Sequence, residues 1–129
     1  SLSMWGKDEL MSAREIPQLR DAGGGPLVLT LTCLSGYYAH AEELSLGEEL
    51  LWAPAGGAVA LVSATGLTVP DDQQPFGQAF LAALLAPETR TLGEALLQAK
   101  HALAPDQVGH RDVINTFLLL GDPALRLRR

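Results

Sequence analysis

The sequence predicts an α/β fold built on a parallel sheet. Two short apolar runs, at residues 27–32 and 58–63, are rich in β-branched side chains and lack polar alternation, which is typical of strands buried on both faces. A capped helix is predicted between these runs, and two more helices follow the second run. Because parallel strands require helical crossovers, the first run, the helix and the second run form one strand–helix–strand unit.

The chain before this unit is less regular. We expect a short helix at residues 11–21 with Ser12 as its N-cap. Pro17 fits this helix only near its start, because proline lacks an N–H and clashes with a preceding turn. Glycine stretches at residues 23–25 and 56–57 then lead into the two apolar runs.

A capping box marks the helix between the two runs. The Ser45 hydroxyl can accept a hydrogen bond from the backbone of Glu48, and the Glu48 carboxylate can reach back to the Ser45 N–H. The helix is predicted from residue 46 to about residue 53, and Pro54 ends it.

The segment after the second run is polar. Residues 65–74 contain the sequence Pro-Asp-Asp at 70–72, which predicts an exposed loop at the same end of the sheet as Cys33. Phe76 and Phe80 then repeat at helical spacing, as core packing requires. The helix that carries them is expected to end at the next proline in the chain.

The last third of the chain predicts one more helix and a final strand. Residues 91–94 form a second capping box, and the helix that follows closes before Pro105. This helix and the preceding one are expected to cover one sheet face. From residue 113 the chain is predicted to enter the segment 117–120 through a short helical or extended stretch, followed by a turn at 121–123 and a last strand near 125–127.

Composition bounds the class of protein. A chain of 129 residues with 47% hydrophobic residues fits one globular domain. The net charge is −6 and the nine Lys and Arg residues are scattered, so we expect no nucleic acid partner. No apolar run is long enough for a membrane span, so no membrane association is expected. A lone cysteine forms no internal disulfide and leaves the cellular compartment open.

The number of strands is low for this fold. Two clear strands and two marginal ones are few for a sheet whose best strands look buried on both faces. Either a partner chain covers the open edge, or the first half of the sheet lies upstream of residue 1. We therefore expect residues 1–129 to be a single partial domain and the isolated chain to associate with itself.

Cys33 is the candidate nucleophile. It follows the first apolar run and precedes a glycine turn at Gly36. A thiol at the carboxyl end of a parallel strand faces the crevice in which open α/β sheets bind ligands. Free cysteine also packs as a small hydrophobic side chain, which is the alternative interpretation. One cysteine and three widely separated histidines give no zinc-type spacing, so neither a metal nor another cofactor is expected.

An ordered set of segments spanning nearly the whole chain resembles the gingipain-like cysteine peptidases. These segments are residues 29–37, 48–51, 56–65, 76–80 and 118–125. The resemblance implies the carboxyl-terminal part of a catalytic domain with a caspase-like (Rossmann-like) three-layer sandwich and a mostly parallel sheet. It also implies a cysteine-type endopeptidase that hydrolyses peptide or protein substrates through a Cys-His dyad.

The resemblance assigns roles to particular residues. Cys33 becomes the nucleophile, and its histidine base and the oxyanion-hole glycine fall upstream of residue 1, since no histidine precedes Cys33. The isolated chain is therefore expected to be inactive. Substrate is expected to contact Gly36 and the end of the second strand at Ser63, Ala64 and Thr65.

The three histidines of the chain are weaker candidates for the base. His40 lies near enough to Cys33 in sequence to curl back, but the resemblance implies that it belongs to a loop beside the site. His101 and His110 are expected on the surface. Asp122 is interpreted as a turn residue.

Two other functions stay open. One is a non-catalytic α/β interaction module in which Cys33 is packed. The other is a CHAT-type caspase-like signalling protease, since the thiol segment and the Gly-Asp-Pro ending are similar to that family too. Asp71 and Asp72 either supply charge for a basic substrate side chain or form a solvated turn.

Overall fold

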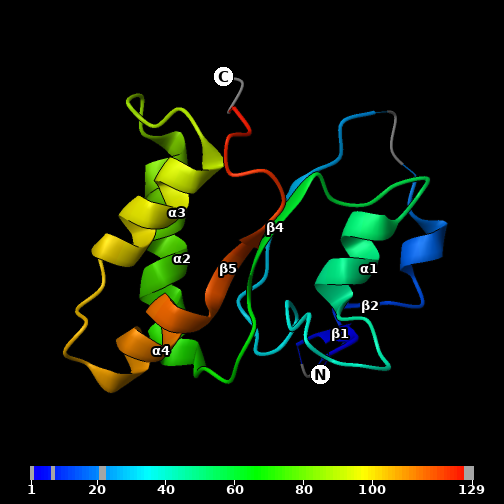
Figure 1. Cartoon of the computed structure of the whole chain (residues 1–129), viewed down its shortest axis with the longest axis horizontal. Helices are drawn as coiled ribbons and strands as arrows, with labels where there is room; N and C mark the ends of the chain where they lie inside the picture. Colours follow the sequence, from blue (N-terminus) through cyan, green and yellow to red (C-terminus); the bar gives the residue numbers. More distant parts are fainter. Residues whose placement is uncertain (1, 7, 21–22, 127–129) are drawn as a thin grey trace.

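The computed structural model describes residues 2–6, 8–20 and 23–126. Its centre is a three-stranded sheet with the strands in the order β3, β4 and β5; β4 and β5 lie side by side in Figure 1. The strands are β3 (Leu27–Leu29), β4 (Ala60–Ala64) and β5 (Phe117–Leu120). β3 and β4 run parallel, as the sequence predicts, whereas β4 and β5 run antiparallel. The α/β class is therefore confirmed, but this sheet is mixed rather than mostly parallel.

The antiparallel direction of β5 follows from the helix before it. α4 (Val108–Thr116) leads directly into β5, and Phe117 is both the C-cap of the helix and the first residue of the strand. Phe117 pairs with Ala64, the last residue of β4. β5 therefore begins at the carboxyl end of β4 and runs back along it.

The sequence does not predict most of α4, the helix in which His110 lies. The start signals that identify a helix are missing here. Gln107 at the N-cap makes no side-chain hydrogen bond to the backbone, and the first turn has no acidic residue. The helix is held instead by packing, through Val113, which is fully buried in the core.

α2 (Pro70–Leu85) begins earlier than the sequence predicts. Residues 70–74, expected in an exposed loop, form its first turn. Proline is preorganised for the first position of a helix, and Asp71 and Asp72 carry negative charge that the helix amino terminus favours. The residues that signal a turn thus also start a helix, and Gln73 becomes a buried helical residue.

The other two α-helices agree with the sequence. They are α1 (Leu46–Trp52) and α3 (Leu92–His101). Both predicted capping boxes form, at Ser45 and at Thr91. In each box the N-cap hydroxyl accepts from the backbone N–H three residues further on, at 3.3 Å.

Helices cover both faces of the sheet (Figure 1). One core cluster joins α2, α3 and α4 to one face of β4 and β5, and its largest side chains are Phe76, Phe80 and Phe117. The other cluster joins α1 and the amino-terminal segment to the opposite face through Ile16, Leu46, Leu50 and Leu61. Every residue of β4 is buried, as expected for a strand between two layers. α2 and α3 share one face, as predicted.

The amino-terminal segment forms a short hairpin and a turn of 3₁₀ helix: β1 (Met4–Trp5), β2 (Met11–Ser12) and η1 (Ile16–Gln18). The predicted helix at residues 11–21 is wrong in this part, because Ser12 pairs in β2. The Glu15 carboxylate accepts from both the N–H and the hydroxyl of Ser12, at 2.7 and 3.1 Å, and closes a turn there. Pro17 lies near the start of η1, and Asp21 lies outside the described residues.

The carboxyl-terminal segment is less regular than predicted. Asp122 is a turn residue, as expected, because its carboxylate accepts from the Ala124 N–H at 2.8 Å. Arg126 forms an isolated bridge with Thr91, and Leu127, part of the expected last strand, lies outside the described residues. Over the described ranges, no helix has both the length and the apolar composition needed to cross a membrane.

Candidate active site

Cys33 lies in a turn that follows β3 and leans on the end of β4. The turn is fixed by two backbone hydrogen bonds, from Leu34 N–H to the Gly66 carbonyl at 3.3 Å and from Gly36 N–H to the Ala64 carbonyl at 3.1 Å. Leu34 has a φ of 64°, in the left-handed region that non-glycine residues seldom adopt. These bonds place the thiol-bearing turn at the carboxyl ends of the two parallel strands.

Helices approach this turn from two sides, and glycines allow the approach. The Gly47 N–H in α1 donates to the Ser35 carbonyl at 2.8 Å. A Cβ at Gly47 would lie 3.0 Å from that same carbonyl oxygen. On the other side, a Cβ at Gly77 in α2 would lie 2.7 Å from a terminal methyl carbon of Leu31. At Gly47 a larger residue would therefore press on the backbone of the turn, whereas at Gly77 it would meet only the end of a flexible side chain.

Three buried hydroxyls lie beneath the turn. Thr30, Ser35 and Ser63 are each fully enclosed. The Thr30 and Ser35 oxygens are 2.8 Å apart, and the Ser63 oxygen lies 2.6 Å from each of them. The Ser35 hydroxyl also lies 3.2 Å from the Thr32 carbonyl oxygen, to which it can donate. This cluster joins the end of β3, the turn and β4 in the interior.

The Cys33 thiol has polar neighbours and is half-buried. It donates to the Thr68 carbonyl oxygen, at 2.8 Å from the sulfur. Gln73 Nε2 donates to Thr68 Oγ1 at 2.7 Å and lies 3.8 Å from the sulfur. Thr68 and Gln73 are more than thirty positions from Cys33 in the sequence. No local pattern around Cys33 identifies them.

The four residues expected to contact substrate lie together beside the turn. A Cβ at Gly36 would lie 3.0 Å from the Ser63 Cβ. Ser63 and Ala64 are fully buried, so their side chains face the interior. Thr65 is partly exposed, and its N–H and hydroxyl both donate to the Thr116 carbonyl at 2.9 Å.

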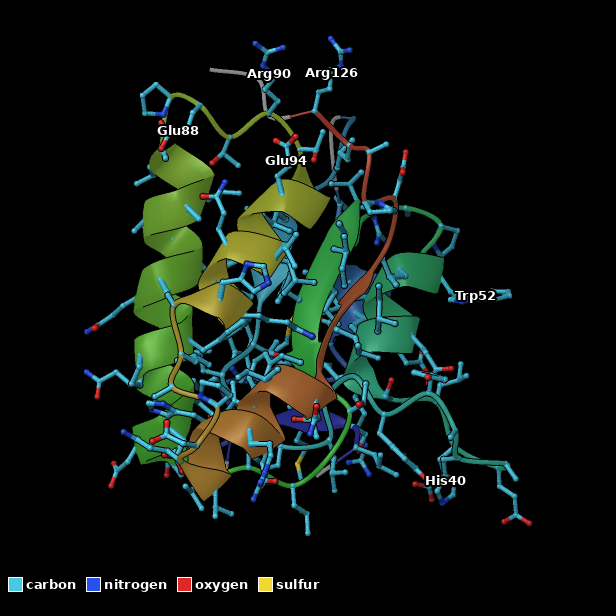
Figure 2. The ribbon with its side chains drawn as sticks, turned by 60° about the vertical axis from the view of Figure 1, so that its left-hand side comes forward. His40, Trp52, Glu88, Arg90, Glu94 and Arg126 are labelled. Carbon is cyan, nitrogen blue, oxygen red and sulfur yellow. The ribbon has the colours of Figure 1, made fainter. Side chains whose placement is uncertain are left out.

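No histidine hydrogen bonds to Cys33 within the part of the chain that the structure describes. His40 is exposed on the loop that leads to α1 (Figure 2), and its Nδ1 accepts from the Glu43 N–H at 3.0 Å. His101 is exposed at the end of α3. His110 Nδ1 accepts from the Ala104 N–H at 3.2 Å.

A cavity of about 270 Å³ borders the thiol's partner Thr68. Its lining is formed by Leu67, Thr68, Val69, Asp72, Val108, Gly109 and Asp112. Two carboxylates, one from α2 and one from α4, therefore share this cavity with apolar side chains. Sequence reasoning finds Asp72 but not Asp112, because it does not recognise α4. Asp71 is exposed in the first turn of α2.

Among the described residues, no group of three or more histidine, cysteine, aspartate or glutamate side chains is close enough to hold a metal ion. The groups that meet at the turn are one thiol, one buried amide and several hydroxyl and carbonyl groups.

Comparison with known proteins matches this chain to one protein family and to solved structures of similar fold. The sequence profile of peptidase family C25 matches residues 1–128. The crystal structure of the Arg-specific cysteine proteinase gingipain R (RGPB) is similar over 99% of this chain, with a TM-score of 0.80 and 20% identity. The complex of Porphyromonas gingivalis RgpB pro- and mature domains is similar over 99% of the chain, with a TM-score of 0.86 and 18% identity.

These solved chains are longer than the present one, which covers 31% and 32% of them. At such identities the likeness shows the fold. No curated protein matches the chain.

Proposed function

The chain belongs to peptidase family C25, and we propose that it forms the nucleophile-bearing part of a cysteine-type endopeptidase catalytic domain. In this proposal the whole domain is a caspase-like three-layer sandwich, of which the described elements supply three strands and their covering helices. Its substrates are peptides or proteins.

The observation that carries the proposal is the position and surroundings of the Cys33 thiol. The thiol follows a parallel strand at the end of the sheet where ligands bind in open α/β folds. It is half-buried and has a carbonyl, a hydroxyl and an amide as neighbours. A cysteine that serves only as a small core hydrophobe would be enclosed by apolar side chains. The surroundings therefore favour chemistry over packing.

In the proposed reaction, Cys33 loses its proton to a histidine and its sulfur bonds to the carbonyl carbon of the scissile peptide. The carbonyl electron pair moves onto oxygen, which becomes an oxyanion. No described residue accepts a hydrogen bond from the Cys33 N–H, so this group can donate to that oxyanion. The tetrahedral species collapses, the leaving amine takes the histidine's proton, and water then hydrolyses the thioester.

The histidine in this scheme is supplied by sequence before residue 1. This placement is proposed because none of the described contacts of the thiol is a histidine. In addition, His40 and His110 already accept backbone hydrogen bonds at Nδ1. Residues 1–129 alone are accordingly proposed to lack turnover. We further propose that Gly36, Ser63 and Ala64 shape the substrate pocket from within and that Thr65 contacts substrate at its edge.

The experiment uses the chain together with its natural preceding sequence. Peptide hydrolysis is measured before and after treatment with a thiol reagent, and in the variant Cys33→Ala. Removing a nucleophile that works with a base lowers turnover by several orders of magnitude, on the order of 10⁶-fold. The variant His40→Ala is the matched control and should keep full activity. Hydrolysis that persists in Cys33→Ala would remove the proposal.

The same preparation distinguishes the non-catalytic interaction module. That alternative predicts a Cys33 thiol that reacts with alkylating reagents only after unfolding, whereas a crevice thiol reacts in the native protein.

A further inference from the structure

Gln73 is a second polar residue of the thiol site that sequence reasoning does not identify. We propose that Gln73 is a positioning residue that holds the Cys33 thiolate once its proton has left, acting together with Thr68. This inference rests on the proposed function, because it concerns the ionised state in which Cys33 would attack a substrate.

The neighbours of the Cys33 sulfur, which already include the Gln73 amide as a long-range donor, suit the protonated and the ionised sulfur differently. The thiol now donates to the Thr68 carbonyl oxygen, 2.8 Å away. A thiolate has no hydrogen to donate, so at that distance it would face the negative end of a carbonyl dipole. The donors within reach lie elsewhere: Gln73 Nε2 at 3.8 Å and Thr68 Oγ1 at 3.9 Å from the sulfur. A small rotation of the Cys33 side chain would exchange the carbonyl for these donors.

Gln73 is held in place for this exchange. Its amide nitrogen has two hydrogens, and the bond to Thr68 Oγ1 at 2.7 Å uses one of them. The sulfur is the other neighbour within hydrogen-bonding range of that nitrogen among the contacts of the described residues. The amide is therefore fixed by Thr68 with its second N–H available to the sulfur.

Burial argues that Gln73 is more than a filler of the core. The residue is 2% exposed, on the same side of α2 as Phe76 and Phe80. An apolar residue would serve packing there without the need to satisfy a buried amide. The Gln73 amide instead contacts two groups of the candidate site, the Thr68 hydroxyl and the Cys33 sulfur, and these contacts account for a polar residue at this position.

The charged groups nearby make a neutral donor useful. Asp72 on α2 and Asp112 on α4 line the cavity that Thr68 borders, so two acidic side chains lie on this side of the site. No histidine hydrogen bonds to the thiol among the described residues. Within this part of the chain, the amide of Gln73 and the hydroxyl of Thr68 are thus the groups placed to stabilise negative charge on sulfur.

The ionisation step itself is simple. The S–H bond breaks, the electron pair stays on sulfur, and the proton passes to a base, which is the histidine of the proposed dyad or hydroxide in solution. The Thr68 carbonyl loses its donor, and the Gln73 amide then donates to the anion.

The test measures alkylation of Cys33 by iodoacetamide, because the thiolate is the reacting form. The chain with its natural preceding sequence is treated from about pH 6 to about pH 11, a range that brackets ordinary thiol ionisation and reaches its alkaline limit. Modification is quantified by mass spectrometry of the peptide that contains Cys33. The variants are Gln73→Leu and Gln73→Met, which keep the volume and remove the donor. Gln74→Leu, one position along the same helix and exposed, is the matched control.

We expect Gln73→Leu and Gln73→Met to slow alkylation at neutral pH on the order of tenfold, the loss of one hydrogen bond to a charged group. Their rates at the alkaline limit should equal that of the unaltered chain, because access to the sulfur is unchanged. The pH profile therefore moves to higher pH, while Gln74→Leu leaves it in place. A merely structural role would lower or raise the rate at every pH together.

Failure of this inference is distinguishable from failure of the proposed function. If both Gln73 variants fold, as judged by circular dichroism, and their pH profiles do not move, Gln73 is not a positioning residue, although hydrolysis can still depend on Cys33. If Gln73→Leu does not fold, Gln73→Met decides, and Thr68→Val provides an independent variant that removes the hydroxyl but keeps the carbonyl. A native thiol that resists alkylation at every pH overturns both ideas.

Discussion

The buried hydroxyl cluster predicts an unequal response to two nearly identical substitutions. Ser35→Ala and Ser63→Ala each remove one hydroxyl from a cluster in which all three oxygens lie within 2.8 Å of one another. Ser35 differs from the other two because it also has the Thr32 carbonyl as an acceptor. Ser35 is therefore the hydroxyl of the cluster that can donate to a described acceptor outside the cluster, the Thr32 carbonyl.

The magnitudes follow from counting donors and acceptors. In Ser63→Ala, Thr30 can donate to Ser35, and Ser35 can donate to Thr32, so every remaining hydrogen is used and unfolding should become easier by about 1–2 kcal/mol. In Ser35→Ala, one hydrogen of the remaining Thr30 and Ser63 pair has no described acceptor. A buried donor without a partner adds a penalty of about 1–3 kcal/mol, so this variant should be the less stable of the two.

The assay is equilibrium unfolding in urea, followed by circular dichroism, with equal slopes required for a valid comparison. The isosteric variant Thr30→Val supplies a third measurement. It keeps the pair of Ser63 and Ser35, and it keeps the hydrogen bond from Ser35 to the Thr32 carbonyl. Its loss should resemble that of Ser63→Ala. Equal losses of unfolding free energy for Ser35→Ala and Ser63→Ala, or the reverse order, would refute the conclusion that Ser35 donates to the Thr32 carbonyl.

Three further predictions concern packing, charge and association. Gly47→Ala should destabilise the chain by about 1–3 kcal/mol in the same urea assay, because the new Cβ meets the fully buried Leu61 and a backbone carbonyl. Gly77→Ala is the comparison: its Cβ meets only the flexible end of Leu31, so its stability should be nearly unchanged. Burial lowers the pKa of Lys100 below 10.5, so the unfolded chain binds more protons between the lowered pKa and 10.5, and stability should rise with pH in that window. Lys100→Met should flatten that rise in thermal melts recorded across alkaline pH. The isolated chain should self-associate, since β3 has one described neighbour strand; a concentration-independent monomer in sedimentation velocity would contradict this.

The parts of the fold that the sequence predicts are those with local signals. Ser45 and Thr91 begin their helices through contacts with residues three positions away, and such contacts can be read directly from the chain. The two parallel strands are also predicted correctly in position, because both runs are apolar. Burial on both faces is confirmed for β4, whereas β3 is shorter than predicted, at Leu27–Leu29, and is only partly buried. Where the start signal is absent, as at Gln107, the helix is missed.

The parts that the sequence does not predict depend on contacts between distant segments. Cys33 is found from its place after an apolar run, but its partners Thr68 and Gln73 become neighbours only when α2 packs beside the turn. The burial of Gln73 follows from the register of α2, which begins at Pro70 rather than after residue 74. The direction of β5 is likewise fixed by the helix that leads into it.

The two hydrogen-bond networks at Cys33 act on different parts of the residue. The cluster of Thr30, Ser35 and Ser63 holds the backbone of the turn from below, and it is closed to solvent. The pair of Thr68 and Gln73 meets the side chain, at the half-buried sulfur. Loss of a cluster hydroxyl should therefore appear chiefly in the free energy of unfolding, and loss of the Gln73 amide chiefly in the pH dependence of thiol reactivity. The proposed nucleophile depends on both networks. The hydroxyl cluster keeps the sulfur at a constant position, and the Gln73 amide can then donate a hydrogen bond to the thiolate at that position.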